Sequence, residues 1–135
     1  MKRILTFGVF DYFHLGHLRL LAQCREYADY LIVAVQNGEF VQKFKPEAKI
    51  LYSTEERVEL LSAIKLVNEV VVYDEVSVST IEKFYFDILA LGQDQQAERF
   101  SNIEKWCNQN GKGVVHLKRT EGISSSVIKE RLLMR

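Results

Sequence analysis

Residues 8–17 read GVFDYFHLGH and join an apolar strand to an amphipathic helix. The apolar run before this stretch predicts a buried strand over residues 4–7. Gly8 ends the strand, and we expect glycine there because it tolerates backbone conformations that other residues avoid. After the stretch, apolar residues recur at helical spacing and predict a helix over about residues 16–27. Strand, turn and helix form the first unit of an α/β fold.

The rest of the chain repeats this alternation of short apolar strands and helices. Further strands are expected at residues 30–35, 69–73, 88–91 and 114–117, and further helices at residues 53–63, 80–84, 102–110 and 125–133. This order predicts one Rossmann-like α/β domain over residues 1–135, with a mostly parallel sheet and helices on both faces. The polar segment around Pro46, the only proline, is expected to be a mobile loop.

Ligands of open α/β sheets bind beyond the carboxyl ends of the strands. Gly8, Gln36, Gly92 and Lys118 each follow a predicted strand directly, so we expect their loops to converge on one cleft.

Composition limits the classes of function. The chain has 135 residues, 47% of them hydrophobic, which is enough for one core, and 18 basic residues balance 18 acidic ones. Without a net charge, nothing favours nucleic acid or an anionic membrane as a partner. The two cysteines are far apart, no signal-peptide pattern is present, and no apolar run is long enough to cross a bilayer. We therefore expect a cytoplasmic protein that binds small molecules.

His14 and His17 lie at the start of the first predicted helix, on either side of Gly16. A separation of three residues places both imidazoles on one face, where unpaired backbone N–H groups and the helix dipole favour an anion. Gly16 lets a phosphate approach the backbone closely. The alternatives are a surface or capping role, and a zinc site, although no cysteine pair or carboxylate–histidine cluster accompanies the histidines.

Residues 119–126 read RTEGISSS and precede the last predicted helix. Serines at such a position commonly cap a helix and do nothing else. Arg119 changes this interpretation, because a planar guanidinium beside hydroxyls and backbone N–H groups can pair phosphate oxygens bidentately. The segment is therefore a candidate receptor for a triphosphate.

Together, residues 8–17 and 119–126 resemble the cytidylyltransferases, members of the His-x-Gly-His nucleotidyltransferases, and most closely the bacterial glycerol-3-phosphate cytidylyltransferases. The resemblance covers almost the whole chain and implies CTP as the nucleotide, magnesium (Mg2+) with the triphosphate, and a homodimer. The His-x-Gly-His element alone also occurs in adenylyltransferases and in class I aminoacyl-tRNA synthetases. The length of the chain excludes a synthetase, and the Arg-Thr-Glu-Gly-Ile-Ser element favours CTP.

The resemblance also implies roles for individual residues. Four residues are expected to be catalytic: His14, His17, Lys43 and Arg119. Nucleotide binding is expected from Gly8, Val9, Phe10, His14, Gly16, His17, Lys45, Arg57, Arg119, Thr120, Gly122, Ile123, Ser124 and Ser125. Lys43 and Asp11 are expected to bind the acceptor, and Asp11 and Asp94 are the candidate contacts of magnesium. Without the family resemblance, other interpretations apply to these residues. Lys43 and Lys45 would be solvated surface residues, Arg57 would form a surface ion pair with a glutamate, and Asp11 would be a turn residue.

The implied reaction is the in-line attack of a phosphomonoester on the α-phosphorus of CTP, giving a CDP-alcohol and pyrophosphate. Catalysis would come from positioning and electrostatic stabilisation. The attacking phosphate is already an anion near neutral pH, so the reaction requires neither a covalent intermediate nor a general base.

Several positions depart from the family pattern. Lys65 and Asn68 replace an arginine and an aspartate, Asp74 and Ser77 replace a tryptophan and a lysine, and residues 92–95, GQDQ, replace Gly-Asp-Asp-Trp. These changes fall on the expected acceptor and base sites. They leave open a polyol, an amino alcohol or a phosphonate as acceptor, and ATP as nucleotide. An adenylyltransferase and a non-catalytic nucleotide-binding module remain as alternatives.

Overall fold

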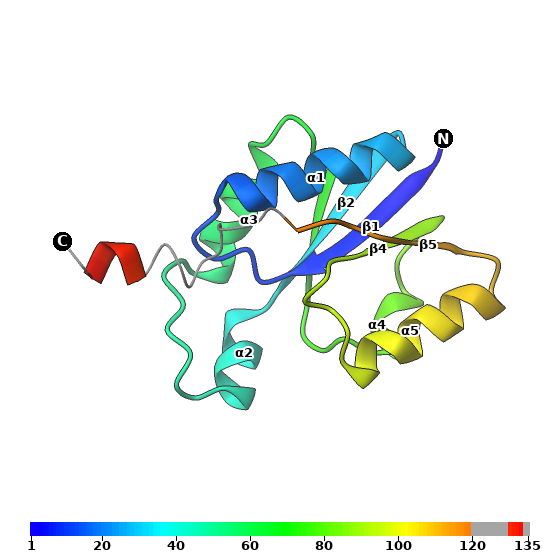
Figure 1. The fold of residues 1–135 in the computed structure, drawn as a ribbon. Helices are drawn as coiled ribbons and strands as arrows, with labels where there is room; N and C mark the ends of the chain where they lie inside the picture. Colours follow the sequence, from blue (N-terminus) through cyan, green and yellow to red (C-terminus); the bar gives the residue numbers. More distant parts are fainter. Residues whose placement is uncertain (120–129, 134–135) are drawn as a thin grey trace.

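The computed structural model describes residues 1–119 and 130–133. Five strands alternate with helices along the chain (Figure 1). In order, the elements are β1 (Arg3–Gly8), α1 (Leu15–Tyr27), β2 (Tyr30–Gln36), α2 (Gly38–Phe44), α3 (Thr54–Ser62), β3 (Glu69–Tyr73), α4 (Val78–Ile81), β4 (Ile88–Leu91), α5 (Glu98–Gln109) and β5 (Gly113–His116). Residues 130–133 are helical and exposed.

The five strands form one sheet in which every pairing is parallel, in the order β3-β2-β1-β4-β5. This confirms the expected α/β fold. From the central strand β1 the chain builds outward through β2 to β3, and it then returns to the other side for β4 and β5. The order therefore reverses between β1 and β4. In such sheets the crevice beyond the carboxyl ends of these two strands is where a ligand binds.

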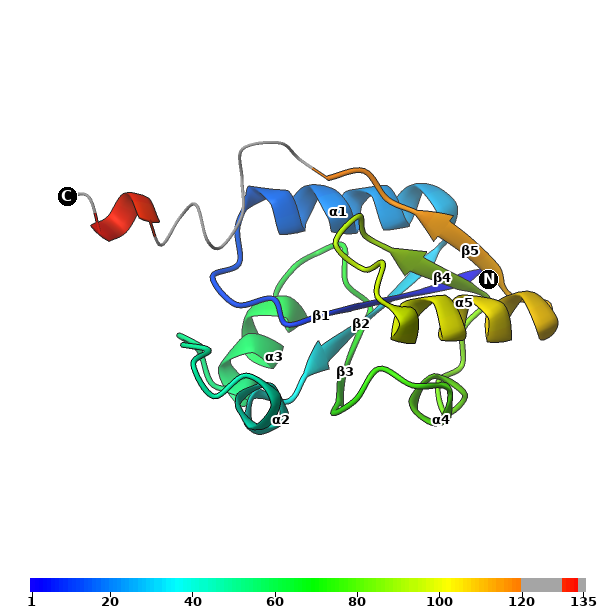
Figure 2. The ribbon, with the colours of Figure 1, turned by 60° about the horizontal axis from the view of Figure 1, so that its bottom comes forward.

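Helices cover both faces of the sheet (Figure 2). Each face has its own apolar core. On one face α1 and α3 contribute Leu21, Cys24 and Leu61, and on the other α4 and α5 contribute Ile81, Phe100, Ile103 and Cys107. Alternate residues of β2 enter the two cores, as the two-residue period of a strand requires. A sheet packed on both sides is a rigid support for the loops at its edge.

The two cysteines and the lengths of the helices bear on the expected cellular location. Cys24 and Cys107 are unpaired and buried in the separate cores, in agreement with reduced thiols. Within the described part of the chain, no helix has the length and apolar character needed to cross a membrane.

The helix α2 corrects part of the loop predicted around Pro46. Pro46 itself lies in the loop between α2 and α3, as expected. Residues 38–44 are helical although none of them is fully buried. Phe40 and Val41 are half-buried, and the rings of Phe40 and Phe44 lie 4.6 Å apart between centroids. Hydrogen bonds at the start of the helix also stabilise it. The Asn37 side chain accepts from the N–H of Glu39, and the N–H of Gly38 donates to Oγ1 of Thr54.

The boundaries of two helices differ from the prediction. The helix α5 begins at Glu98, four residues before the predicted start at residue 102, and Ala97 provides no side-chain cap. The helix α4 spans residues 78–81 instead of 80–84, because the side chain of Ser77 caps it. The strand β5 lies one residue earlier than predicted, and the other strands agree with prediction to within one residue at each end.

Candidate active site

The turn after β1 contains two residues in the left-handed region. Phe10 has φ 56° and Tyr12 has φ 50°, a conformation that costs a residue with a side chain about 1–3 kcal/mol. Phe10 folds back over the end of β1, so a Cβ at Gly8 would lie 2.7 Å from its ring. Gly8 has no positive φ, which corrects the conformational reason given for it. Glycine is needed there because the Phe10 ring occupies the space of a side chain.

His14 and His17 cap the start of α1 reciprocally. Nδ1 of His14 accepts from the N–H of Gly16 at 3.1 Å, and the N–H of His14 donates to Nδ1 of His17 at 3.2 Å. The two rings stack with centroids 3.8 Å apart. Such a box satisfies backbone donors that a helix start leaves without partners. It also fixes both imidazoles in one orientation.

Because each Nδ1 is an acceptor, the ring proton of each neutral histidine lies on Nε2. Burial and then the neighbouring His14 lower the pKa of His17 from near 6.5 to about 4. Burial and then the charge of Arg119 lower the pKa of His14. The rings of Phe10 and Phe13, each 5.3 Å from His17 between centroids, surround that imidazole with apolar atoms. At neutral pH the pair therefore presents two Nε2–H donors without positive charge.

Asp11 lies in the same turn but faces the backbone of another segment. Its carboxylate oxygens accept the N–H groups of Leu51 and Tyr52 at 2.8 and 3.1 Å, and its side chain is buried, with the residue 8% exposed. The sequence analysis predicts that Asp11 binds the acceptor or contacts magnesium. In the structure these oxygens instead hold the chain just before α3.

Arg57 is fully buried, which contradicts its interpretation as a surface ion pair. Its guanidinium donates to the carbonyl oxygens of Val9 and Gln36, both at 2.8 Å, and to Tyr52 O and Thr54 Oγ1. These protein oxygens occupy four of the five guanidinium N–H donors, and the expected contact with nucleotide stays a prediction. Arg57 joins the ends of β1 and β2 to the start of α3.

The loops after β4 and β5 are joined to the same region. Gln95 spans the crevice between β1 and β4, accepting from the N–H of Gly92 at 2.9 Å and donating to Phe7 O at 2.8 Å. Beside it, Asp94 forms an ion pair of 3.1 Å with Arg119. Arg119 also acts electrostatically on His14. Arg119 therefore lies within electrostatic range of His14, and its contact with phosphate stays a prediction.

The structure shows no phosphate contact for the remaining predicted site residues that it describes. Lys43 lies in the last turn of α2 and Lys45 caps its end, and both are exposed, so their phosphate contacts stay predictions. Thr120, Gly122, Ile123, Ser124 and Ser125 lie outside the described residues, as does most of the predicted last helix.

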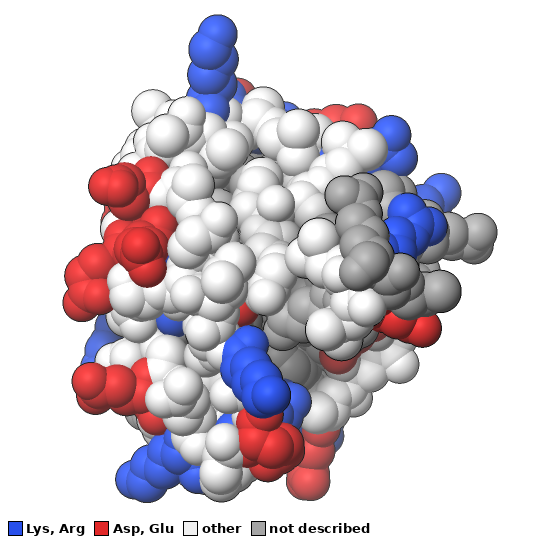
Figure 3. Space-filling model, turned by 90° about the vertical axis from the view of Figure 1, so that its left-hand side faces the viewer, with Lys and Arg blue, Asp and Glu red and all other residues white. Residues whose placement is uncertain are grey.

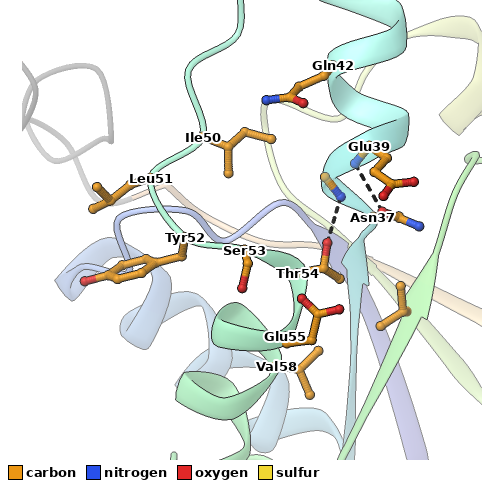
Figure 4. A pocket seen from close by; sticks show the side chains of 12 residues that line it. Asn37, Glu39, Gln42, Ile50, Leu51, Tyr52, Ser53, Thr54, Glu55 and Val58 are labelled. Atoms are coloured by element: carbon orange, nitrogen blue, oxygen red, sulfur yellow. Dashed lines mark hydrogen bonds between the residues drawn. The ribbon is translucent and has the colours of Figure 1, made fainter.

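A pocket of about 640 Å³ opens between α2 and α3 (Figure 4). Its wall includes the starts of both helices and the exposed end of β3. The lining residues are Asn37, Gly38, Glu39, Gln42, Ile50, Leu51, Tyr52, Ser53, Thr54, Glu55, Val58 and Val72. The sequence analysis predicts a functional role for none of these lining residues. The signals that could have indicated the pocket are the helix caps Asn37 and Ser53. The carboxylates of Glu39 and Glu55 make the pocket unfavourable for a phosphate.

On the side of the molecule at the carboxyl ends of the strands, the described residues form no broad basic area (Figure 3). Among the described residues drawn there, acidic side chains line one margin and the basic ones are scattered. Among the described residues, local groups such as the histidine pair are the candidates for binding an anion on this side.

Magnesium binding stays a prediction of the sequence. Within the described residues no group of three or more His, Cys, Asp or Glu side chains could hold a metal ion. Mg2+ bound to nucleotide phosphates needs only one or two carboxylates. Asp94 fits this need, because its side chain is 74% exposed beside Arg119, whereas the buried Asp11 carboxylate accepts two backbone N–H groups.

The chain is similar to known nucleotidyltransferases in sequence and to a solved structure in fold. The chain matches the family described as cytidylyltransferase-like over residues 5–131. It is 39% identical to a glycerol-3-phosphate cytidylyltransferase of Staphylococcus aureus over 98% of this chain and 96% of that one. It is 41% identical to an FAD synthase of Pyrococcus abyssi, over 69% of this chain and 64% of that one. A lipopolysaccharide core biosynthesis protein of Thermoplasma volcanium has a similar structure, with a TM-score of 0.72 and 26% identity over 89% of this chain and 97% of that one. The chain therefore belongs to the cytidylyltransferase-like family of nucleotidyltransferases.

Proposed function

We propose that the protein transfers CMP from CTP to a small phosphorylated alcohol and releases pyrophosphate. The observation that carries the proposal is the reciprocal cap of His14 and His17, which leaves two neutral Nε2–H donors at the start of α1. The near-complete coverage of glycerol-3-phosphate cytidylyltransferases supports CTP and an acceptor of that class.

In the proposed reaction a phosphate oxygen of the acceptor attacks the α-phosphorus of CTP in line. The new bond joins this oxygen to the α-phosphorus, and the bond from the α-phosphorus to the bridging oxygen of the β-phosphate breaks. Pyrophosphate leaves with that oxygen and the electron pair. No covalent enzyme intermediate forms, so the protein acts by positioning and by stabilising charge.

The histidines would donate their Nε2–H bonds to the phosphate oxygens on which charge develops. Such preorganised donors contribute most when they are oriented before the reaction, which the reciprocal cap achieves. Arg119 would bind the β- and γ-phosphates and the leaving pyrophosphate. Lys43 and Lys45 would neutralise the remaining charge of acceptor and nucleotide.

The remaining parts of the proposal rest on the family resemblance and on sequence. Val9, Phe10 and Gly16 would contact the nucleotide beside the histidines, and Thr120, Gly122, Ile123, Ser124 and Ser125 would complete the phosphate receptor. Magnesium, bound by the phosphates and Asp94, would supply positive charge to the triphosphate. A homodimer in the cytoplasm completes the proposal.

A second candidate is an adenylyltransferase that uses ATP. The FAD synthase relatives, 41% identical over 95 residues, favour this reading. The base-site loop also supports it, because Gln95 stands where the cytidylyltransferase pattern has tryptophan.

Pyrophosphate release in the presence of magnesium tests both candidates. CTP and ATP are each offered with glycerol 3-phosphate, a polyol phosphate, an amino-alcohol phosphate and FMN. Release with CTP and one phosphorylated alcohol is expected, and a preference for ATP would establish the second candidate. Binding of CTP in a titration, with no release from any pair, would indicate a non-catalytic nucleotide-binding module.

A further inference from the structure

The carboxylate of Asp11 connects the histidine turn, residues 9–17, to a segment 40 residues further along the chain. Its two oxygens accept the N–H groups of Leu51 and Tyr52 at 2.8 and 3.1 Å. A charged acceptor with two backbone donors makes stronger bonds than a neutral one. The connection is also protected from water, since Asp11 is 8% exposed.

The backbone around Asp11 is held in an uncommon conformation. Phe10 and Tyr12, the residues on either side, both have positive φ, at 56° and 50°. Such strain persists only where surrounding contacts impose it. The contacts here are the Phe10 ring over Gly8 and the two bonds from Asp11 to the distant segment.

Arg57 fastens the other side of the same arrangement. It donates to Val9 O in the histidine turn, to Gln36 O just before α2, and to Tyr52 O at the end of the distant segment. The N–H of Gly38 adds a bond to Thr54 Oγ1. The end of residues 38–52 is therefore bonded directly to the turn that carries the histidines, and their start is bonded to α3, which Arg57 joins to Val9 O.

From these contacts we infer that Asp11 is a positioning residue, which latches residues 45–53, the connecting segment between α2 and α3, onto the histidine turn. Lys43 and Lys45 lie between the two attachment points, in α2 and at its end. The latch sets their distance from the histidines. This inference rests on the proposed function insofar as the lysines act on phosphates.

The geometry explains why Asp11 acts through the segment and not on a ligand. Its carboxylate is buried against backbone donors, so a metal or an acceptor would have to displace those bonds. Its negative charge also lies close enough to His17 to oppose the lowering of that pKa. One carboxylate therefore contacts the segment and acts on the histidine turn.

Limited digestion with trypsin tests the latch without any assumption about substrate. Lys49–Ile50 is the cleavable bond next to the latched residues, and Lys45 is followed by Pro46, which trypsin does not cleave. In Asp11→Ala, cleavage at Lys49 should accelerate about tenfold or more, because local opening sets the rate. Asp11→Asn keeps one acceptor oxygen and should be intermediate.

Asp87→Ala is the matched control. Asp87 also accepts a backbone N–H, that of Arg3 at 2.9 Å, but at the opposite end of the sheet. This control should leave both cleavage at Lys49 and activity unchanged. Circular dichroism of each variant separates a local effect from loss of the fold. Unchanged cleavage in a folded Asp11→Ala protein would overturn the latch, whatever reaction the enzyme catalyses.

A double-mutant cycle tests how Asp11 affects catalysis. If Asp11 acts through the lysine segment, Asp11→Ala and Lys45→Ala remove the same contribution. The kcat/KM of the double variant should then equal that of the less active single variant, within about threefold. Losses that multiply would mean that Asp11 acts independently of Lys45, as a ligand would, and would overturn the inference.

Discussion

His14 and His17 each direct Nδ1 toward the backbone, and the N–H of His14 itself donates to His17. The backbone thus determines which nitrogen of each ring carries the proton. A phosphate that meets these rings encounters fixed donors, and the histidines need no charge to bind it.

The first prediction separates the two nitrogens of His17. Asparagine places an oxygen where Nδ1 accepts but has no group at Nε2, so His17→Asn should keep the fold and lose about 10²–10³ in kcat. Glutamine places an N–H near Nε2 but loses the cap, so His17→Gln should retain more activity and lose about 1 kcal/mol of unfolding free energy. Steady-state kinetics and urea unfolding measure both. Equal kcat in the two variants would argue against the donor role.

The second prediction concerns acid sensitivity. The pKa of His17 is about 4 in the folded protein and near 6.5 when unfolded. Above pH 6.5 neither state binds the proton, and as the pH falls from 6.5 toward 4 only the unfolded state takes it up. The free energy of unfolding should therefore fall over this window, by at most about 1.4 kcal/mol per pH unit.

Urea unfolding between pH 7 and pH 4 measures this loss, and His17→Asn is the control because it cannot take up the proton. The decline should be less steep in the variant. An identical slope in both proteins would show that His17 titrates normally in the fold.

The third prediction follows from the contact between Gly8 and Phe10. An alanine Cβ at Gly8 would lie 2.7 Å from the Phe10 ring, so Gly8→Ala must displace the ring and should cost about 1–3 kcal/mol of unfolding free energy. At Gly113 the nearest atom would be an ordinary 3.5 Å away, and Gly113→Ala should change stability by less than about 0.5 kcal/mol. Chemical unfolding compares them. Equal effects would show that Phe10 moves freely.

The fourth prediction concerns Gln95, which bridges Phe7 and Gly92. Gln95→Ala removes both hydrogen bonds and should lower the free energy of unfolding by about 1–2 kcal/mol. It should also raise the KM for nucleotide, because the loop carries Asp94, the partner of Arg119. Gln96→Ala changes an exposed glutamine in the same loop and should alter neither quantity. A normal KM in Gln95→Ala would separate the loop from nucleotide binding.

Much of the fold could be predicted from the sequence because its strands are short apolar runs with clear ends. The helix α2 was missed because it is short and fully buries no residue, and because a bond to Thr54 at its start has no local sequence pattern. The start of α5 was missed because Ala97 gives no capping signal.

The site shows the same division. The spacing of His14 and His17 indicated a shared face and an anion site, but the reciprocal cap depends on backbone geometry. Arg57 looked like a surface cation because it stands among glutamates in the sequence. Only the three-dimensional arrangement places it under three separate carbonyl oxygens.

The most direct test of the proposed reaction is phosphorus NMR of CTP, magnesium and a small phosphorylated alcohol, with glycerol 3-phosphate first. The proposal predicts that enzyme converts CTP and acceptor into a CDP-alcohol and pyrophosphate in equal amounts. His17→Asn should slow this conversion by about 10²–10³. Formation of CDP with a new phosphate ester, or of CMP and pyrophosphate without acceptor, would contradict cytidylyl transfer.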